Sequence, residues 1–237
     1  MKRYTSVAAL AIRLTWLYVL VYIGTLCALQ WVAFLNVNNV SGQALEFRLD
    51  NLPMGSGKLG MVAMMLMLHG SLKGGKGSQY NITLKRLSLS QLSLAAVWTL
   101  VFAGWFLLYW AAQLLNLFGM YANYVHTYGG SENLLFTVAM RSKYFHYLLP
   151  LYEPWGFVRN VVLCFALGSF TALGSMNARN GRWNPLCLFF MVLIPWGIMT
   201  PQSVATQGAD IAVSVIALIC VIWDWIWTWR WMRNENA

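Results

Sequence analysis

The sequence predicts an all-α membrane protein, built as a bundle of helices that crosses a lipid bilayer several times. Of its 237 residues, 59% are hydrophobic and only 10% are charged, whereas an ordinary soluble domain has about 25% charged residues. Long apolar runs also recur along the whole chain. Such a small number of charged residues cannot cover the core of a soluble domain of this size. The composition therefore excludes almost any soluble domain, and it also excludes a disordered chain and a fibrous repeat.

Six segments are apolar enough to be expected as spanning helices, each of which needs about 20 mostly apolar residues. They lie at about 14–35, 55–72, 94–118, 157–176, 185–199 and 209–229, within a single transmembrane domain of residues 1–237. The first run is too long for a signal peptide and lacks a cleavage site, so we expect a retained helix. The second is short and spans only if Lys58 extends to the interface. The fifth carries Pro195, which can kink or end a helix.

The distribution of Lys and Arg predicts the orientation of these helices. With six spans, both termini and two of the loops share one side. Eleven basic residues fall on that side, against the acids Asp224 and Glu235: Lys2, Arg3, Arg13, Lys73, Lys76, Lys85, Arg86, Arg179, Arg182, Arg230 and Arg233. The other side has five basic and five acidic residues, so one face carries the whole formal charge of +9. Both termini are therefore expected in the cytoplasm, and the charge indicates basic cytoplasmic loops rather than nucleic-acid binding.

The residue types that carry chemistry form no clear site. Cys27, Cys164, Cys187 and Cys220 lie in apolar runs without metal-ligand spacing and are interpreted as small apolar residues. The segment Gly70–Gly77 resembles a phosphate-binding loop but has Gly77 where Ser or Thr should hold magnesium. We therefore expect no metal, no cofactor and no catalytic residue on this chain.

Two further functions were considered: an intramembrane serine protease, which stays open, and ion or proton transport, which the sequence supports only weakly. A Ser and one of the three His residues can still meet in the fold, as an intramembrane serine protease requires. Charged residues at mid-depth would favour ion or proton transport, but Arg159 and Asp224 fall near helix ends, where snorkelling or pairing explains them.

Small and aromatic residues mark two further features. Gly168, Ser169, Ala172 and Ser175 recur at helical spacing, which predicts close helix packing within the chain or, alternatively, at a dimer contact. Five tryptophans alternate near the C-terminal end and are interpreted as an interfacial girdle rather than a ligand-binding stripe: Trp223, Trp225, Trp227, Trp229 and Trp231.

Two segments outside the spans have apolar helical faces. Residues 78–91 are predicted to form a short cytoplasmic helix, with a solvated linker as the alternative. Residues 133–149 are predicted to form an amphipathic helix in the outer interface, because Arg141 and Lys143 make a seventh span costly. Tyr144 and His146 belong to the same outer helix.

The stretch Lys76-Gly77-Ser78-Gln79-Tyr80-Asn81-Ile82-Thr83-Leu84-Lys85-Arg86-Leu87-Ser88-Leu89-Ser90 resembles the connection between the second and third helices of small bacterial ABC type-2 exporter permeases. In that family a T-L-x-R-L segment, followed by small polar residues, touches the ATPase. The matching residues here are Thr83, Leu84, Arg86 and Leu87. The segments at Arg141–His146 and Leu148–Leu151 are also similar to an outer-loop pattern of some members. The short second helix and the brief link from Thr200 to Gln207 depart from the family's pattern.

The resemblance implies one half of an exporter in the bacterial plasma membrane. A second copy or a homologous permease would pair with the chain, and two cytoplasmic ATPases would bind ATP and dock on a surface that includes Tyr80 and Lys85. The chain itself would be no enzyme, and it would move a peptide, a lipid-like molecule or a drug outward. The alternatives are a membrane protein that binds a partner without transport, such as an immunity-type or structural protein, and then a small channel or intramembrane enzyme.

Overall fold

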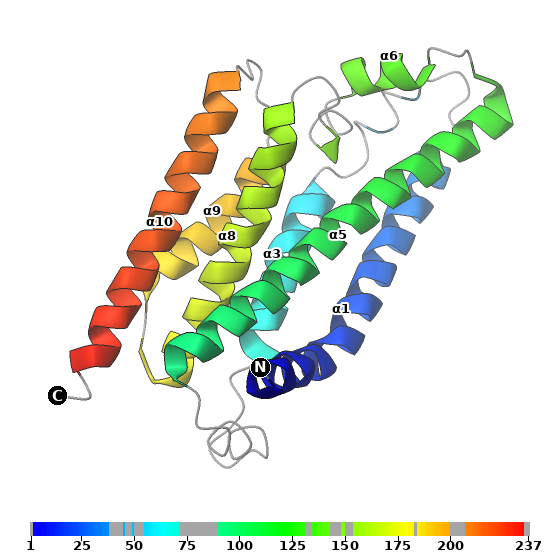
Figure 1. Ribbon diagram of the computed structural model, residues 1–237. Helices are drawn as coiled ribbons and strands as arrows, with labels where there is room; N and C mark the ends of the chain where they lie inside the picture. The colour runs from blue at the N-terminus through cyan, green and yellow to red at the C-terminus, as the bar shows by residue number, and fades with distance from the viewer. Residues whose placement is uncertain are drawn as a thin grey trace.

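The computed structural model describes an all-α chain (Figure 1). The described residues are 2–37, 45, 49, 55–71, 90–130, 134–142, 148–149, 154–182, 184–199 and 207–234. Within them the helices are α1 (Lys2–Val37), α3 (Gly55–Ser71), α5 (Gln91–Tyr128), α6 (Leu134–Arg141), α8 (Pro154–Arg179), α9 (Pro185–Met199) and α10 (Gln207–Asn234). The predicted all-α class is confirmed.

Six of these helices form one bundle in which consecutive helices run in opposite directions, while α6 lies across the upper end of the bundle (Figure 1). Helix α1 begins and α10 ends at the lower end. Helix α3 ends and α5 begins at the lower end too, so residues 72–89 join two lower helix ends. The first and the last helix thus have their outer ends at the same end of the bundle.

Four helices are long and apolar enough to cross a membrane: Tyr4–Asn36, Gln91–Tyr128, Pro154–Arg179 and Gly208–Trp231. Large apolar side chains on the outside of the bundle are exposed, among them Tyr18 at 62%, Leu115 at 73% and Ile222 at 58%. Water would penalise such a surface, whereas lipid would not. The chain has the architecture of a multi-pass membrane protein.

Helices α3 and α9 are shorter, at 17 and 15 residues, where about 20 residues span the hydrocarbon core. Pro195 does not end α9, which continues to Met199. Both short helices pack against α8 and against each other, so neighbouring helices rather than lipid surround much of them. Whether they complete six crossings stays a prediction.

Helix α8 is the centre of the bundle, because it packs against α5, α10, α9 and α3. Its side chains are buried almost continuously from Leu163 to Asn177, with Phe165 as the exception. The three small residues Gly168, Ala172 and Ser175 are all buried within the chain. At Gly168 a Cβ atom would lie 2.5 Å from the backbone nitrogen of Ala103, so α8 and α5 are in backbone contact there.

Two helices extend beyond the apolar runs from which they were predicted. Helix α1 begins at Lys2 rather than near residue 14, and α5 extends to Tyr128, ten residues past the expected end at 118. Apolar content alone marked those bounds, but polar residues continue a helix wherever its backbone hydrogen bonds continue. Helix α5 ends only at Gly129, whose φ of 75° is a backbone conformation that glycine adopts readily and other residues adopt rarely.

Of the predicted outer helix 133–149, the structure describes helix α6, Leu134–Arg141, and the short stretch 148–149. Helix α6 ends at Arg141, and Ser142 is no longer helical, although its N–H still bonds to the Val138 carbonyl at 2.8 Å. Leu148 is buried and its carbonyl accepts a hydrogen bond from Trp110 Nε1 on α5 at 3.1 Å. Residues 143–147, between these two described parts, lie outside the described residues.

Candidate functional site

Two buried clusters of charged and polar side chains lie toward opposite ends of the bundle. Toward the upper end, Arg159 of α8 and Asp210 of α10 form an ion pair with Nη1 and Oδ1 2.5 Å apart. Their side chains are 3% and 1% exposed. Asn160 Oδ1 accepts from Arg159 Nε at 3.3 Å and Nη2 at 3.1 Å. This pair ties the start of α8 to the start of α10, where the N-terminal dipole of α10 also favours the carboxylate.

Toward the lower end, Asp224 of α10 is only 4% exposed and faces the start of α9. Its Oδ1 accepts from Asn184 Nδ2 at 2.8 Å, and its Oδ2 accepts from the Cys187 thiol at 2.8 Å. Asn184 also accepts from the Cys187 backbone N–H through Oδ1, at 3.3 Å. The three side chains therefore form a connected network that fixes the register of α9 against α10.

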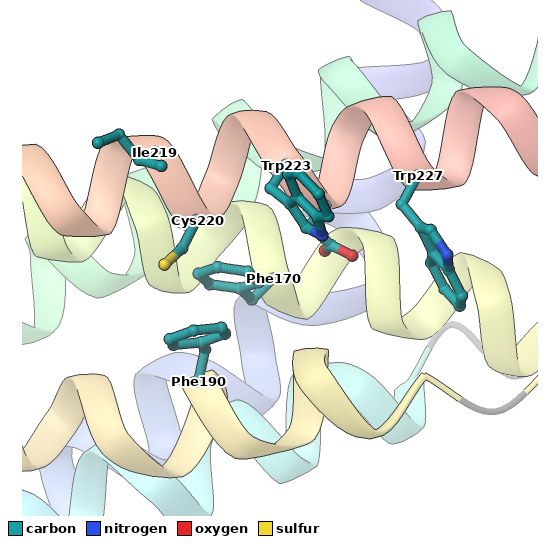
Figure 2. Close-up of a pocket in the computed structure, with 7 residues that line it drawn as sticks. Phe170, Phe190, Ile219, Cys220, Trp223 and Trp227 are labelled. Atoms are coloured by element: carbon teal, nitrogen blue, oxygen red, sulfur yellow. The ribbon is translucent and has the colours of Figure 1, made fainter.

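A pocket of about 300 Å³ opens next to this network, between α8, α9 and α10 (Figure 2). Its lining is aromatic and apolar except for one acid: Phe170, Phe190, Ile219, Cys220, Trp223, Asp224 and Trp227. The rings of Phe170 and Phe190 are stacked at 5.1 Å and face each other across α8 and α9 in Figure 2. This is the candidate functional site.

The pocket corrects two interpretations of single residue types. Trp223 and Trp227 line it, and Trp225 donates from Nε1 to Ser169 Oγ at 2.8 Å. The alternating tryptophans are thus not only an interfacial girdle. Cys187 is also more than a small apolar residue, since its thiol binds Asp224.

Asp224 itself was placed wrongly near a helix end. Helix α10 continues to Asn234, so Asp224 lies about 15 Å from the end of the helix at 1.5 Å per residue. Among the described residues it does not pair with a cation.

The structure also brings a serine and a histidine together. Ser175 Oγ lies 3.4 Å from His69 Nδ1, but the same hydroxyl donates to the Thr171 carbonyl at 2.6 Å. A general base would have to receive that proton, which is already directed at the backbone. The contact joins α3 to α8.

Polar contacts also hold α1 and α3 to α5. Gln30 exchanges hydrogen bonds with Gln113 at 2.9 Å and Asn116 at 2.8 Å. The Tyr109 and Tyr22 hydroxyls donate to the carbonyls of Gly57 and Gly60 in the first turns of α3, at 2.9 and 2.7 Å. These bonds, formed between helices rather than with water, fix the positions of the short helix and of α1.

The residues expected to contact an ATPase are Tyr80, Thr83, Leu84, Lys85, Arg86 and Leu87, and all lie outside the described residues. Only the end of their segment is described. Ser90 caps α5 by accepting from the Ser93 N–H at 3.2 Å, and Gln91 accepts from Asn180 Nδ2 at 3.2 Å. The bond from Asn180 to Gln91 therefore links the lower ends of α8 and α5, directly after this segment.

Of the outer-helix residues, Arg141 is exposed at the end of α6, whereas Lys143, Tyr144 and His146 lie outside the described part of the chain. In the described ranges no three His, Cys, Asp or Glu side chains come together as metal ligands. Sequence reasoning missed the two buried clusters. It also missed the pocket, although the i, i+4 spacing of Trp223 and Trp227 signalled a shared helix face.

The chain was also compared with known proteins. No protein-family model, no curated protein and no solved structure matches it.

Proposed function

We propose that this chain is the membrane subunit of an ABC exporter in the bacterial plasma membrane, driven by cytoplasmic ATPase subunits. The observation that carries the proposal is the position of the segment that resembles the coupling region of ABC type-2 permeases. Residues 76–90 connect the lower ends of α3 and α5, at the end of the bundle where α1 begins and α10 ends (Figure 1).

The charges of this lower end support a cytoplasmic orientation. The described helix ends carry Arg179 and Arg230, and the Arg182 guanidinium lies 5.0 Å from the centre of the Trp231 ring. At the upper end Arg159 is neutralised by Asp210. A concentration of basic residues at one end is typical of the cytoplasmic side.

The attachment of the coupling segment provides a path for movement. A push on residues 78–89 acts on α5 through the Ser90 cap and on α8 through Gln91 and Asn180. Helices α5 and α8 form the most extensive helix pair in the bundle, so they would move as a unit. In this proposal two such chains, identical or homologous, pair in the bilayer, and two ATPases bind ATP below them, while this chain binds no cofactor and hydrolyses nothing.

The orientation is open to a labelling experiment. Single cysteines at Ser41, Ser131, Ser88 and Asn236, in a background without the four native cysteines, should divide into two classes. A membrane-impermeant thiol reagent on intact cells should label positions 41 and 131 only, and should reach 88 and 236 after permeabilisation. Labelling of position 88 in intact cells would place the coupling segment outside and end the proposal.

The coupling surface predicts a difference between two double variants. Leu84→Ala with Leu87→Ala should reduce the amount of ATPase recovered with the chain by at least tenfold, because buried apolar anchors dominate interface energy. Lys85→Ala with Arg86→Ala should reduce it less, since charges at an interface rim contribute less. The measurement is the ratio of ATP-binding subunit to tagged chain after purification from native membranes.

Two other leucines of the chain provide a control for the leucine double variant. Leu100→Ala with Leu115→Ala changes two exposed leucines of α5, and should leave the ratio unchanged. If the leucine pair at 84 and 87 behaves like this control pair, the coupling assignment is wrong.

A further inference from the structure

The pocket between α8, α9 and α10 combines aromatic rings with one buried acid. Four rings surround it, those of Phe170, Phe190, Trp223 and Trp227, and they come from three different helices (Figure 2). Its volume of about 300 Å³ falls at the small end of the range of ligand pockets, which is about 300–1,000 Å³. The space is large enough for a small organic head group.

The acid in the wall is Asp224, and both of its described partners are neutral. Asn184 donates an amide N–H to one oxygen and Cys187 donates a thiol to the other. Both oxygens of the carboxyl group accept, so neither contact requires a proton on Asp224. An ionised carboxylate that is 96% buried, with no cation among its described partners, carries an uncompensated desolvation cost.

The upper cluster shows how the same bundle treats a comparable acid. Asp210 is as deeply buried and is paired with Arg159. Asp224 has no such cation among its described partners, and it contributes to the wall of the aromatic pocket. The missing positive charge would be supplied by whatever fills the pocket.

We propose that this pocket binds an organic ammonium ion, with the cation between the aromatic rings and the Asp224 carboxylate. The faces of Trp and Phe rings attract cations that lie within about 6 Å of the ring centre, and rings arranged as a cage select alkylated ammonium groups. The carboxylate adds the opposite charge at low dielectric, where the attraction is strong. A metal ion is a poor fit, because the lining offers a single carboxylate and otherwise apolar atoms.

The ligand enters from the bilayer side. Trp223 is 64% exposed and Ile219 is 58% exposed, so the mouth of the pocket lies on the outer surface of α10 that faces lipid. The inference does not depend on an ATPase partner, because it concerns binding to the purified chain alone.

The test uses benzyltrimethylammonium and its neutral isostere neopentylbenzene, in which carbon replaces the charged nitrogen. Equilibrium dialysis of the radiolabelled cation against the chain in a non-ionic detergent should show saturable binding of one cation per chain. Neopentylbenzene should compete at least tenfold more weakly than unlabelled cation. Equal competition would make the site merely apolar and overturn the proposal without the use of any variant.

Variants then locate the site. Asp224→Asn keeps the shape of the side chain but removes its charge, and should weaken binding at least tenfold. Trp223→Leu with Trp227→Leu should weaken binding several-fold, whereas Trp16→Leu, an exposed tryptophan on α1, should not change it. Folding is checked by the elution profile of each variant on size exclusion. Unchanged cation binding by a folded Asp224→Asn variant would equally contradict the assignment.

Discussion

Asp210→Ala is expected to destabilise the folded chain by about 3–5 kcal/mol, because it leaves the buried Arg159 guanidinium without its counter-charge. The pair is almost fully buried, with side chains 3% and 1% exposed, so water cannot replace the lost partner. Asn160 still offers one carbonyl oxygen to the guanidinium, but a neutral acceptor does not balance the charge. Arg159→Met should have a comparable effect for the same reason.

The double variant Arg159→Met with Asp210→Leu separates the cost of an unpaired charge from the contribution of the pair. It removes both charges and fills the space with apolar side chains, and should recover most of the lost stability. Stability is measured as the midpoint of unfolding in mixed micelles with increasing dodecyl sulfate. A double variant that is as unstable as the single variants added together would show that the two residues do not act as a pair.

Gly168→Ala is expected to destabilise the bundle by about 1–3 kcal/mol, the usual cost of forcing an extra group into a packed interior. The new Cβ would lie 2.5 Å from the Ala103 nitrogen and 2.8 Å from its Cα. Both are backbone atoms of α5, which cannot rotate away, so the two helices must separate. Gly168→Leu should prevent the α5–α8 contact and abolish the folded state.

Gly104→Ala is the matched control for this contact. Gly104 lies next to Ala103 on α5, and its added Cβ would meet nothing within 4 Å. The control should unfold at the same detergent concentration as the unchanged chain, or slightly above it, since Ala has the higher helix propensity. Equal midpoints for Gly168→Ala and Gly104→Ala would show that the close approach at Gly168 is not required for packing.

The helical part of the fold could be predicted because apolar content is a local property of the chain. Each apolar run predicted a segment in which the structure has a helix, including the short α3. The ends were less predictable, because a helix such as α5 continues through Tyr121 and Asn123 as long as its backbone hydrogen bonds do. Small residues at helical spacing also identified the face of α8 that holds Gly168.

The buried polar clusters could not be predicted, because they depend on how helices are rotated against one another. Arg159 and Asp210 are 51 residues apart, and nothing in either segment specifies the other as its partner. The sequence placed both on the same side of the membrane, but not in contact. Asp224 was assigned to a helix end, since the apolar run was taken to stop at residue 229.

The tryptophans show how a correct periodicity can still mislead. Their alternation is incompatible with one helical stripe, and this favoured a girdle at the membrane interface. Subsets four residues apart do share a face: Trp227 packs on Trp231 with ring centres 5.1 Å apart, and Trp223 and Trp227 line one pocket. The sequence pattern is compatible with tryptophans at the membrane interface and with tryptophans that line a pocket. Only the positions of α8 and α9 relative to α10 show which tryptophans line the pocket.

The central claim is that this chain works with an ATP-hydrolysing partner, and ATP hydrolysis by the assembly tests it most directly. The chain should be purified in mild detergent through a tag at its C-terminus, from native membranes that express it at its normal level. We predict ATP hydrolysis by a co-purified cytoplasmic subunit with a phosphate-binding loop, and loss of that activity with Leu84→Ala and Leu87→Ala. A folded chain that purifies without such a subunit and without ATP hydrolysis would contradict the account.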